Sequence, residues 1–230
     1  METLEQNIAI VKSKIGEAAA KSGRSPEEIH LVAVTKTVPP ETVQKAVNLG
    51  ITLLGENRVQ EAREKVDIVR GNVQWHLIGH LQKNKVKPAI KLFSMIQSLD
   101  SLGLAEEIEK RAGEIRRVMD VLIQINIGRE ETKSGIDADD AVEFIKKVSQ
   151  LPHIKIKGLM AIPPFKEDPE EVRYYFRKMN DIFQNIKMMQ IENVEMNFLS
   201  MGMTHDFGIA IEEGSNMVRI GTGIFGKRKQ

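Results

Sequence analysis

Lys36 is the residue whose type and surroundings most strongly suggest chemistry. It is the only charged side chain in the apolar run 31–37 (LVAVTKT). Moving an amine out of water is costly unless the amine is neutral, paired or covalently bonded. The simpler interpretation is that Lys36 ends a strand and extends its amine into solvent. The run by itself favours that simpler interpretation, so other residues must decide between the two.

Arg219 is a second lone cation in a short apolar run, at 217–220 (MVRI). If the two runs are the first and last strands of a closed sheet and both side chains point inward, Arg219 and Lys36 share one cavity. Repulsion between the two cations, together with desolvation, would then favour the neutral form of the Lys36 amine. A neutral lysine amine is a nucleophile that forms Schiff bases with carbonyl compounds.

Glycines and hydroxyl residues after the last two apolar runs have the composition of a phosphate-binding cradle. They are Ser200, Gly202, Thr204, Gly221 and Thr222. Glycine lets the main chain approach phosphate oxygens closely, and hydroxyl groups add donors without charge. With Lys36 and Arg219, this cradle suggests pyridoxal 5′-phosphate (PLP), its aldehyde on Lys36 and its ring nitrogen towards Arg219. Arginine keeps its protons, so the ring would stay neutral and would be a weak electron sink.

Short β-branched runs alternate with amphipathic stretches along the chain, which is typical of a (β/α)₈ TIM barrel. The eight runs cover residues 31–37, 51–54, 75–79, 94–97, 120–127, 156–162, 196–201 and 217–220. In such a barrel the chemistry lies at the carboxyl ends of the parallel strands, where Lys36 and the cradle residues stand. A doubly wound open sheet is the alternative fold.

Apolar residues at helical spacing predict an extra helix before the first strand. They are Leu4, Ile8, Val11, Ile15 and Ala18. We expect one PLP-binding domain over 1–230, because no linker or break in composition divides the chain. The helical extension would cover 1–29 and the barrel 31–226.

The composition excludes several classes of function. Lys and Arg total 33 against 32 Asp and Glu, a net charge of +1, so we expect neither a nucleic-acid nor a membrane surface. The absence of cysteine excludes disulfides and a thiolate nucleophile. No signal peptide or membrane span is predicted, and we therefore expect a cytoplasmic protein.

His76 and His80 stand four residues apart, a spacing that could bind a metal on a helix. Ile78 and Gly79 favour a strand there instead, and no third ligand is evident, so we predict no metal site. We expect His80 either at the rim of the cofactor pocket or in a structural hydrogen bond. The role of His205 stays open.

Five segments in order along the chain resemble the pyridoxal phosphate homeostasis protein family. They are AVTKT at 33–37, GENRVQE at 55–61, WHLIGHLQKNK at 75–85, LSMGM at 199–203 and VRIGT at 218–222. The resemblance implies a barrel similar to the amino-terminal domain of alanine racemase, with Lys36 as the Schiff-base lysine. It further implies Asn57 beside the cofactor and Arg219 near the pyridine nitrogen. The phosphate would be held around Ser200, Gly202, Met203, Gly221 and Thr222, and Thr204 keeps the hydroxyl where the family often has serine.

Our leading hypothesis is a non-catalytic protein that holds PLP reversibly on Lys36 and buffers or delivers it. Racemisation needs an acid or base on each face of the reacting carbon. Alanine racemase supplies the opposing tyrosine from a second domain across a dimer, whereas we expect no second domain here. Tyr174 and Tyr175 are better explained by a long amphipathic helix. An exposed cofactor face favours exchange, so we expect a monomer whose partners are PLP and the apo-enzymes that receive it.

Two other functions remain open at this point. One is a PLP-dependent amino-acid racemase or decarboxylase that uses Lys36 as its base. The other is a class I aldolase, in which a barrel lysine forms a Schiff base with a phosphorylated sugar and needs no cofactor. A protein that stays colourless with PLP would favour the aldolase.

Overall fold

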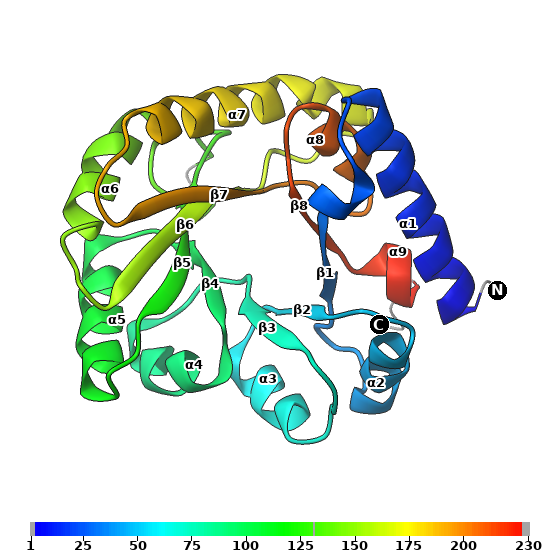
Figure 1. Cartoon of the computed structure of the whole chain (residues 1–230), viewed down its shortest axis with the longest axis horizontal. Helices are drawn as coiled ribbons and strands as arrows, with labels where there is room; N and C mark the ends of the chain where they lie inside the picture. The colour runs from blue at the N-terminus through cyan, green and yellow to red at the C-terminus, as the bar shows by residue number, and fades with distance from the viewer. Residues whose placement is uncertain (1–2, 131, 227–230) are drawn as a thin grey trace.

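The strands of the chain form a closed parallel barrel. The computed structural model describes residues 3–130 and 132–226. In this part of the chain eight strands pair in sequence order, and β8 pairs with β1 (Figure 1). The strands are β1 (His30–Val34), β2 (Leu53–Glu56), β3 (Gln74–Leu77), β4 (Met95–Leu99), β5 (Met119–Ile125), β6 (Ile154–Ala161), β7 (Val194–Ser200) and β8 (Met217–Ile220). The (β/α)₈ barrel is confirmed, and the open doubly wound sheet is wrong.

Helices surround the barrel and connect its strands (Figure 1). The α-helices are α1 (Leu4–Lys21), α2 (Pro40–Asn48), α3 (Val59–Val66), α4 (Val86–Leu92), α5 (Leu102–Glu114), α6 (Ala141–Val148), α7 (Arg173–Met188), α8 (Phe207–Glu212) and α9 (Thr222–Phe225). Short 3₁₀ helices are η1 (Pro26–Glu28), η2 (Lys83–Lys85), η3 (Ala138–Asp140) and η4 (Pro169–Val172). None of the helices in the described part of the chain is long and apolar enough to cross a membrane.

The expected helix before the barrel is confirmed as α1. A capping box starts it, in which the Gln6 N–H donates to Thr3 Oγ1 (3.2 Å) and the Thr3 N–H donates to Gln6 Oε1 (2.8 Å). The buried side of α1 carries Ile8, Val11 and Ile15, and the helix packs against α8 and α9. The extra helix therefore covers the part of the barrel where the chain closes.

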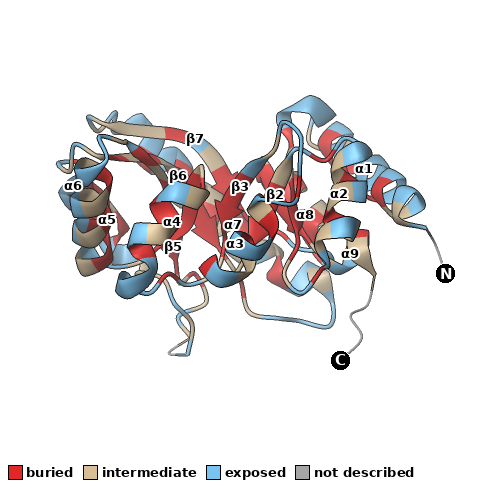
Figure 2. Cartoon of the chain, turned by 90° about the horizontal axis from the view of Figure 1, so that it is seen from below, coloured by how far each residue is buried: buried red, intermediate tan, exposed pale blue. Residues whose placement is uncertain are grey.

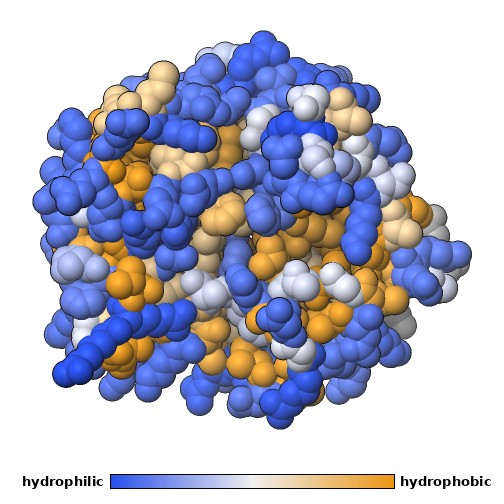
Figure 3. Space-filling view, in the orientation of Figure 1, coloured by the Kyte–Doolittle hydropathy of each residue, from blue (hydrophilic) through white to orange (hydrophobic). Residues whose placement is uncertain are grey.

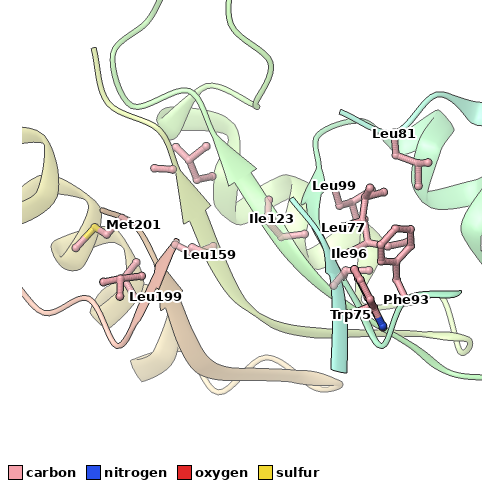
Figure 4. Close-up of a cluster of buried hydrophobic side chains, with 14 of the residues drawn as sticks. Trp75, Leu77, Leu81, Phe93, Ile96, Leu99, Ile123, Leu159, Leu199 and Met201 are labelled. Carbon is pink, nitrogen blue, oxygen red and sulfur yellow. The ribbon is translucent and has the colours of Figure 1, made fainter. Parts of the chain in front are cut away.

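The hydrophobic core has two layers, one between the strands and helices and one inside the barrel. Figure 2 shows buried residues concentrated on the strands and exposed residues on the outer sides of the helices. Trp75, Leu77 and Phe93 belong to the outer layer (Figure 4). The inner cluster contains Val32, Met95, Leu122, Met160 and Met217. In Figure 3 hydrophilic residues dominate the periphery and hydrophobic residues show between them towards the middle.

The first strand ends earlier than the sequence pattern predicts. β1 ends at Val34 rather than at residue 37, although the Thr35 N–H still donates to the Gly55 carbonyl (2.9 Å). Thr37 has a φ of +61°, a left-handed conformation that stops an extended strand. Lys36 therefore lies in the turn that follows β1, and its placement inside a strand was wrong.

Gly158 lies at an irregularity in the pairing of β6 with both neighbouring strands. Its φ of +147° is one that other residues rarely adopt, and a Cβ there would overlap the carbonyl oxygen of Phe198. The absence of a side chain thus lets β7 approach β6.

We expect Gly158→Ala to lower the free energy of unfolding by at least about 2 kcal/mol, through backbone strain and overlap with β7. Gly16→Ala is the control, because a Cβ at this helical position would lie 3.7 Å from Pro26. The control should leave stability unchanged or raise it by up to about 1 kcal/mol. Equal unfolding free energies for the two variants in urea titrations would contradict this account.

Candidate functional site

The expected site residues follow strands that lie next to one another in the barrel. β1 is flanked by β8 and β2 and runs parallel to both. Because parallel strands end on the same side, the segments that follow them begin at one mouth of the barrel. Lys36 follows β1, Asn57 follows β2 and Gly221 follows β8. Closure of the sheet thus brings the early and late segments of the sequence together.

The backbone on both sides of Lys36 is held by helix α3. Lys65 donates from Nζ to the Thr35 carbonyl (2.6 Å), and the Thr37 N–H donates to Glu61 Oε2 (2.9 Å). Lys36 itself is half-buried. Two side chains of one helix therefore fix the peptide groups that flank the candidate nucleophile.

A buried ion pair supports this anchor. Lys65 Nζ lies 2.6 Å from Glu56 Oε1, and both side chains are almost completely buried. The Thr35 hydroxyl donates to the same Glu56 oxygen (2.6 Å). Burial raises the pKa of Glu56, and the hydrogen bonds from Lys65 and Thr35 oppose the rise. Removing one partner of such a pair leaves an uncompensated buried charge, which is strongly destabilising.

The sequence interpretation missed the roles of Glu56, Glu61 and Lys65. The signal was present in the helix pattern, because Lys65 falls at helical spacing with Val59 and Ala62 on the buried side of α3. A lysine on an apolar stripe predicts a buried partner, and Glu56 is the acid that precedes this helix in the sequence.

The two late segments are joined by hydroxyl groups. The Gly223 N–H donates to Thr204 Oγ1 (3.2 Å), and the Thr222 hydroxyl lies 3.2 Å from the same oxygen. Thr204 follows β7, whereas Thr222 and Gly223 begin α9 after β8. The structure thus brings Thr204 and Thr222 together, with Gly221 as the residue that precedes α9.

Gly202 and Met203 shape the segment after β7. Gly202 has a φ of +94°, and a Cβ there would lie 2.6 Å from that of Ala210. The Met203 N–H donates to Asp206 Oδ1 (2.6 Å). Burial raises the pKa of Asp206, and the hydrogen bond from Met203 opposes the rise. Asp206 therefore fixes the main chain of a predicted cradle residue, a role that the sequence did not reveal.

Arg219 is buried inside the barrel among neutral partners. Its guanidinium donates to Ser200 Oγ (2.5 Å) and to the Ala161 carbonyl (2.9 Å). Burial lowers the pKa of Arg219 to about 10, and the charge of Asp206 opposes the fall. The guanidinium stays protonated at neutral pH, so it can act as a fixed donor.

Ser200 connects Arg219 to a chain of polar groups across the barrel. Its hydroxyl donates to Gln97 Oε1 (2.7 Å), and Gln97 Nε2 lies 3.0 Å from His76 Nδ1. A hydroxyl has a single proton to donate, and Ser200 donates it to Gln97. Ser200 therefore belongs to this buried chain of polar groups, whereas the hydroxyls of Thr204 and Thr222 contact each other in the late segments.

His76 ends this chain in the inner part of the barrel. Burial lowers its pKa to about 4, with a smaller contribution from His30. The ring is therefore neutral at pH 7 and accepts a hydrogen bond at Nδ1 from Gln97. Sequence reasoning placed neither His76 nor Gln97 in the site, although Gln97 is a polar residue in a strand whose five residues are all buried.

Two further histidines, His80 and His205, lie in exposed polar contacts. His80 Nδ1 is 3.3 Å from Asp100 Oδ2, and the His80 side chain is 56% exposed. His205 Nε2 lies 3.0 Å from the Glu167 carbonyl oxygen. Within residues 3–130 and 132–226, no group of three or more His, Asp or Glu side chains is placed to hold a metal ion.

The donors at this mouth fit an aldehyde that carries a phosphate. A half-buried primary amine stands after β1, and two hydroxyls with a backbone N–H meet where the late segments join. Amines condense with aldehydes, and hydroxyls with backbone N–H groups bind phosphate oxygens. The buried guanidinium adds a donor that does not release its proton.

Comparisons with known proteins agree with this fit. The family described as alanine racemase, N-terminal domain, matches residues 2–229. The pyridoxal phosphate homeostasis protein of Aquifex aeolicus is 44% identical, over 97% of this chain and 98% of that protein. PipY of Synechococcus elongatus, solved with PLP bound, is 31% identical with a TM-score of 0.85, over 97% of this chain and 100% of that one. Alanine racemase of Clostridium difficile shares the fold at 16% identity, with a TM-score of 0.77, over 99% of this chain and 57% of that one.

We expect His76 to make stability depend on pH. Its pKa is about 4 in the folded protein and near 6.5 in an unfolded chain. Below pH 6.5 the unfolded state therefore takes up a proton that the folded state does not. The free energy of unfolding should fall by about 3 kcal/mol between pH 7 and pH 4 through this group.

Urea titrations at both pH values would measure the effect. His76→Gln should lose that part of the pH dependence, whereas His80→Gln, at an exposed position, should keep it. A His76→Gln variant with the pH dependence of the unaltered protein would contradict the assignment.

Proposed function

The chain belongs to the pyridoxal phosphate homeostasis protein family, and on that premise we propose that it binds PLP as a reversible Schiff base on Lys36. PLP supplies an aldehyde that condenses with a primary amine and a phosphate that needs several donors. In this proposal the whole chain, residues 1–230, acts as one PLP-binding domain. Its task is to hold PLP and keep it available within the cell.

The candidate residues divide this task by their chemistry. Lys36 provides the amine, and Asn57 lies beside the cofactor at the neighbouring strand end. Thr204, Gly221 and Thr222 hold the phosphate where the two late segments meet. Gly202 and Met203 contribute the main chain of the segment after β7, which Asp206 fixes.

Arg219 interacts with the ring of the cofactor rather than with its phosphate, and Ser200 holds the Arg219 guanidinium in place. Arg219 lies towards the pyridine nitrogen, and Ser200 acts on the cofactor through the guanidinium that it contacts. The observation that carries the non-catalytic proposal is this burial of Arg219 against Ser200 and Ala161. A guanidinium donates a hydrogen bond but keeps its proton, so the ring nitrogen facing it stays unprotonated. A neutral ring withdraws electrons weakly, which suits storage better than carbanion chemistry.

The two tyrosines of the chain do not compete with this assignment. Both lie in the first turn of α7, where Tyr175 packs against the buried core and Tyr174 is exposed. Their rings contact each other at a centroid distance of 5.6 Å. A helix position thus accounts for both residues, as the sequence pattern predicts.

Partners and location complete the proposal. We propose a cytoplasmic monomer that exchanges PLP with solvent and delivers it to apo-enzymes. Exchange is favoured where one face of a bound cofactor stays open to solvent. Sedimentation of the PLP-loaded protein as a dimer would contradict the monomer.

We expect the unaltered protein to develop an aldimine absorption band with PLP, at longer wavelength than the band of free PLP, because an imine to Lys36 replaces the aldehyde group that is conjugated with the ring. Lys36→Ala should abolish the band, and Lys45→Ala, at an exposed lysine of α2, should keep it. An apo-enzyme added to the loaded protein should gain activity as the band fades.

Two results would contradict the proposal in different ways. A band that survives in Lys36→Ala would remove Lys36 from the site. Steady turnover of an amino acid by the purified protein, lost in Lys36→Ala, would favour a PLP-dependent racemase or decarboxylase over a carrier.

A further inference from the structure

A cavity opens at the carboxyl ends of β2 and β3, where helices α3 and α4 begin. It has a volume of about 480 Å³, within the range of about 300–1,000 Å³ that is typical of small-molecule sites. Val59, Leu81 and Pro88 give it an apolar wall. α3 and α4 pack side by side next to it (Figure 1).

The charged groups of this cavity are all cations. Arg58, Arg63 and Lys85 line it, and no lining residue is acidic. His80 also lines the cavity and faces Asp100 outside it. The net charge of the chain is only +1, so three cations around one cavity are a local concentration.

These cations differ from several others in the fold in having no acidic partner. Arg111 and Arg173 form ion pairs with glutamates of their surroundings. Arg58, Arg63 and Lys85 take part in no ion pair within the described residues 3–130 and 132–226. Mutual repulsion of unpaired cations is relieved when an anion binds between them.

We propose that this cavity is a second, non-covalent site for a phosphate ester with an aromatic body. Arginine forks bind phosphate oxygens in pairs, and the lysine adds a compact charge. The apolar wall would contact the ring. The preference for an anion follows from the cations alone, whereas the choice of an aromatic ester rests on the proposed function.

Asn57 links this cavity to the candidate cofactor site. It lines the cavity and follows β2 at the same barrel mouth as Lys36. A Cβ at Gly79 would overlap the Asn57 carbonyl, so the glycine lets the segments after β2 and β3 touch beside the cavity that both line. In this proposal the cavity holds an aromatic phosphate ester of the PLP type when that ester is not attached to Lys36.

The test uses protein in which PLP has been fixed by borohydride reduction, so that its covalent site is full. Pyridoxamine 5′-phosphate is titrated into this protein by calorimetry. We expect saturable binding of one molecule per chain, weakened at least about tenfold in Arg58→Gln/Arg63→Gln. The matched control Arg70→Gln/Arg116→Gln removes two exposed arginines elsewhere and should leave the affinity unchanged. Pyridoxamine without phosphate should not bind.

Several results would overturn the proposal. Absence of saturable binding, equal binding by the cavity variant and the control, or equal binding of unphosphorylated pyridoxamine would each do so. Inorganic phosphate that binds as tightly as the ester would overturn the aromatic part. Separate measurements distinguish the two proposals: an aldimine band that survives in Lys36→Ala would contradict the proposed function, whereas unchanged ester binding by loaded Arg58→Gln/Arg63→Gln would contradict the cavity site alone.

Discussion

The pairing of β8 with β1 is the constraint on which the candidate site depends. In this pairing Val32 stands beside Arg219, and both belong to the buried interior of the barrel. Residues almost two hundred positions apart in the sequence thereby lie side by side in the barrel. The same closure puts the segment after β8 beside the turn that carries Lys36, and hydrogen bonds to Thr204 join the segment after β7 to it.

The site buries two cations and stabilises each in its own way. Lys65 is paired with the carboxylate of Glu56, which compensates its charge at close range. Arg219 contacts the neutral groups of Ser200 and Ala161 instead. The paired cation, Lys65, has a structural role, because it also donates a hydrogen bond to the backbone carbonyl that precedes Lys36. A cation among neutral groups keeps its charge available, and a bound anion or ring nitrogen is the partner it can take.

Much of the fold could be predicted, because the strands of the barrel are short apolar runs in the sequence and amphipathic stretches separate them. The strand at 217–220 has the predicted bounds, since its apolar run ends at the glycine that precedes α9. The end of β1 could not be predicted, because Thr37 adopts its left-handed conformation where Glu61 of α3 binds its N–H. The chain from Ser200 through Gln97 to His76 was equally hidden, since it joins side chains of β7, β4 and β3 that only the closed barrel brings together.

The lysine to which PLP attaches can be identified directly. The protein is incubated with PLP, reduced with borohydride to make the linkage permanent, digested and mapped by peptide mass spectrometry. We expect one pyridoxyl adduct, on the peptide that contains Lys36. An adduct on any other lysine, with Lys36 unmodified, would contradict the account of this site.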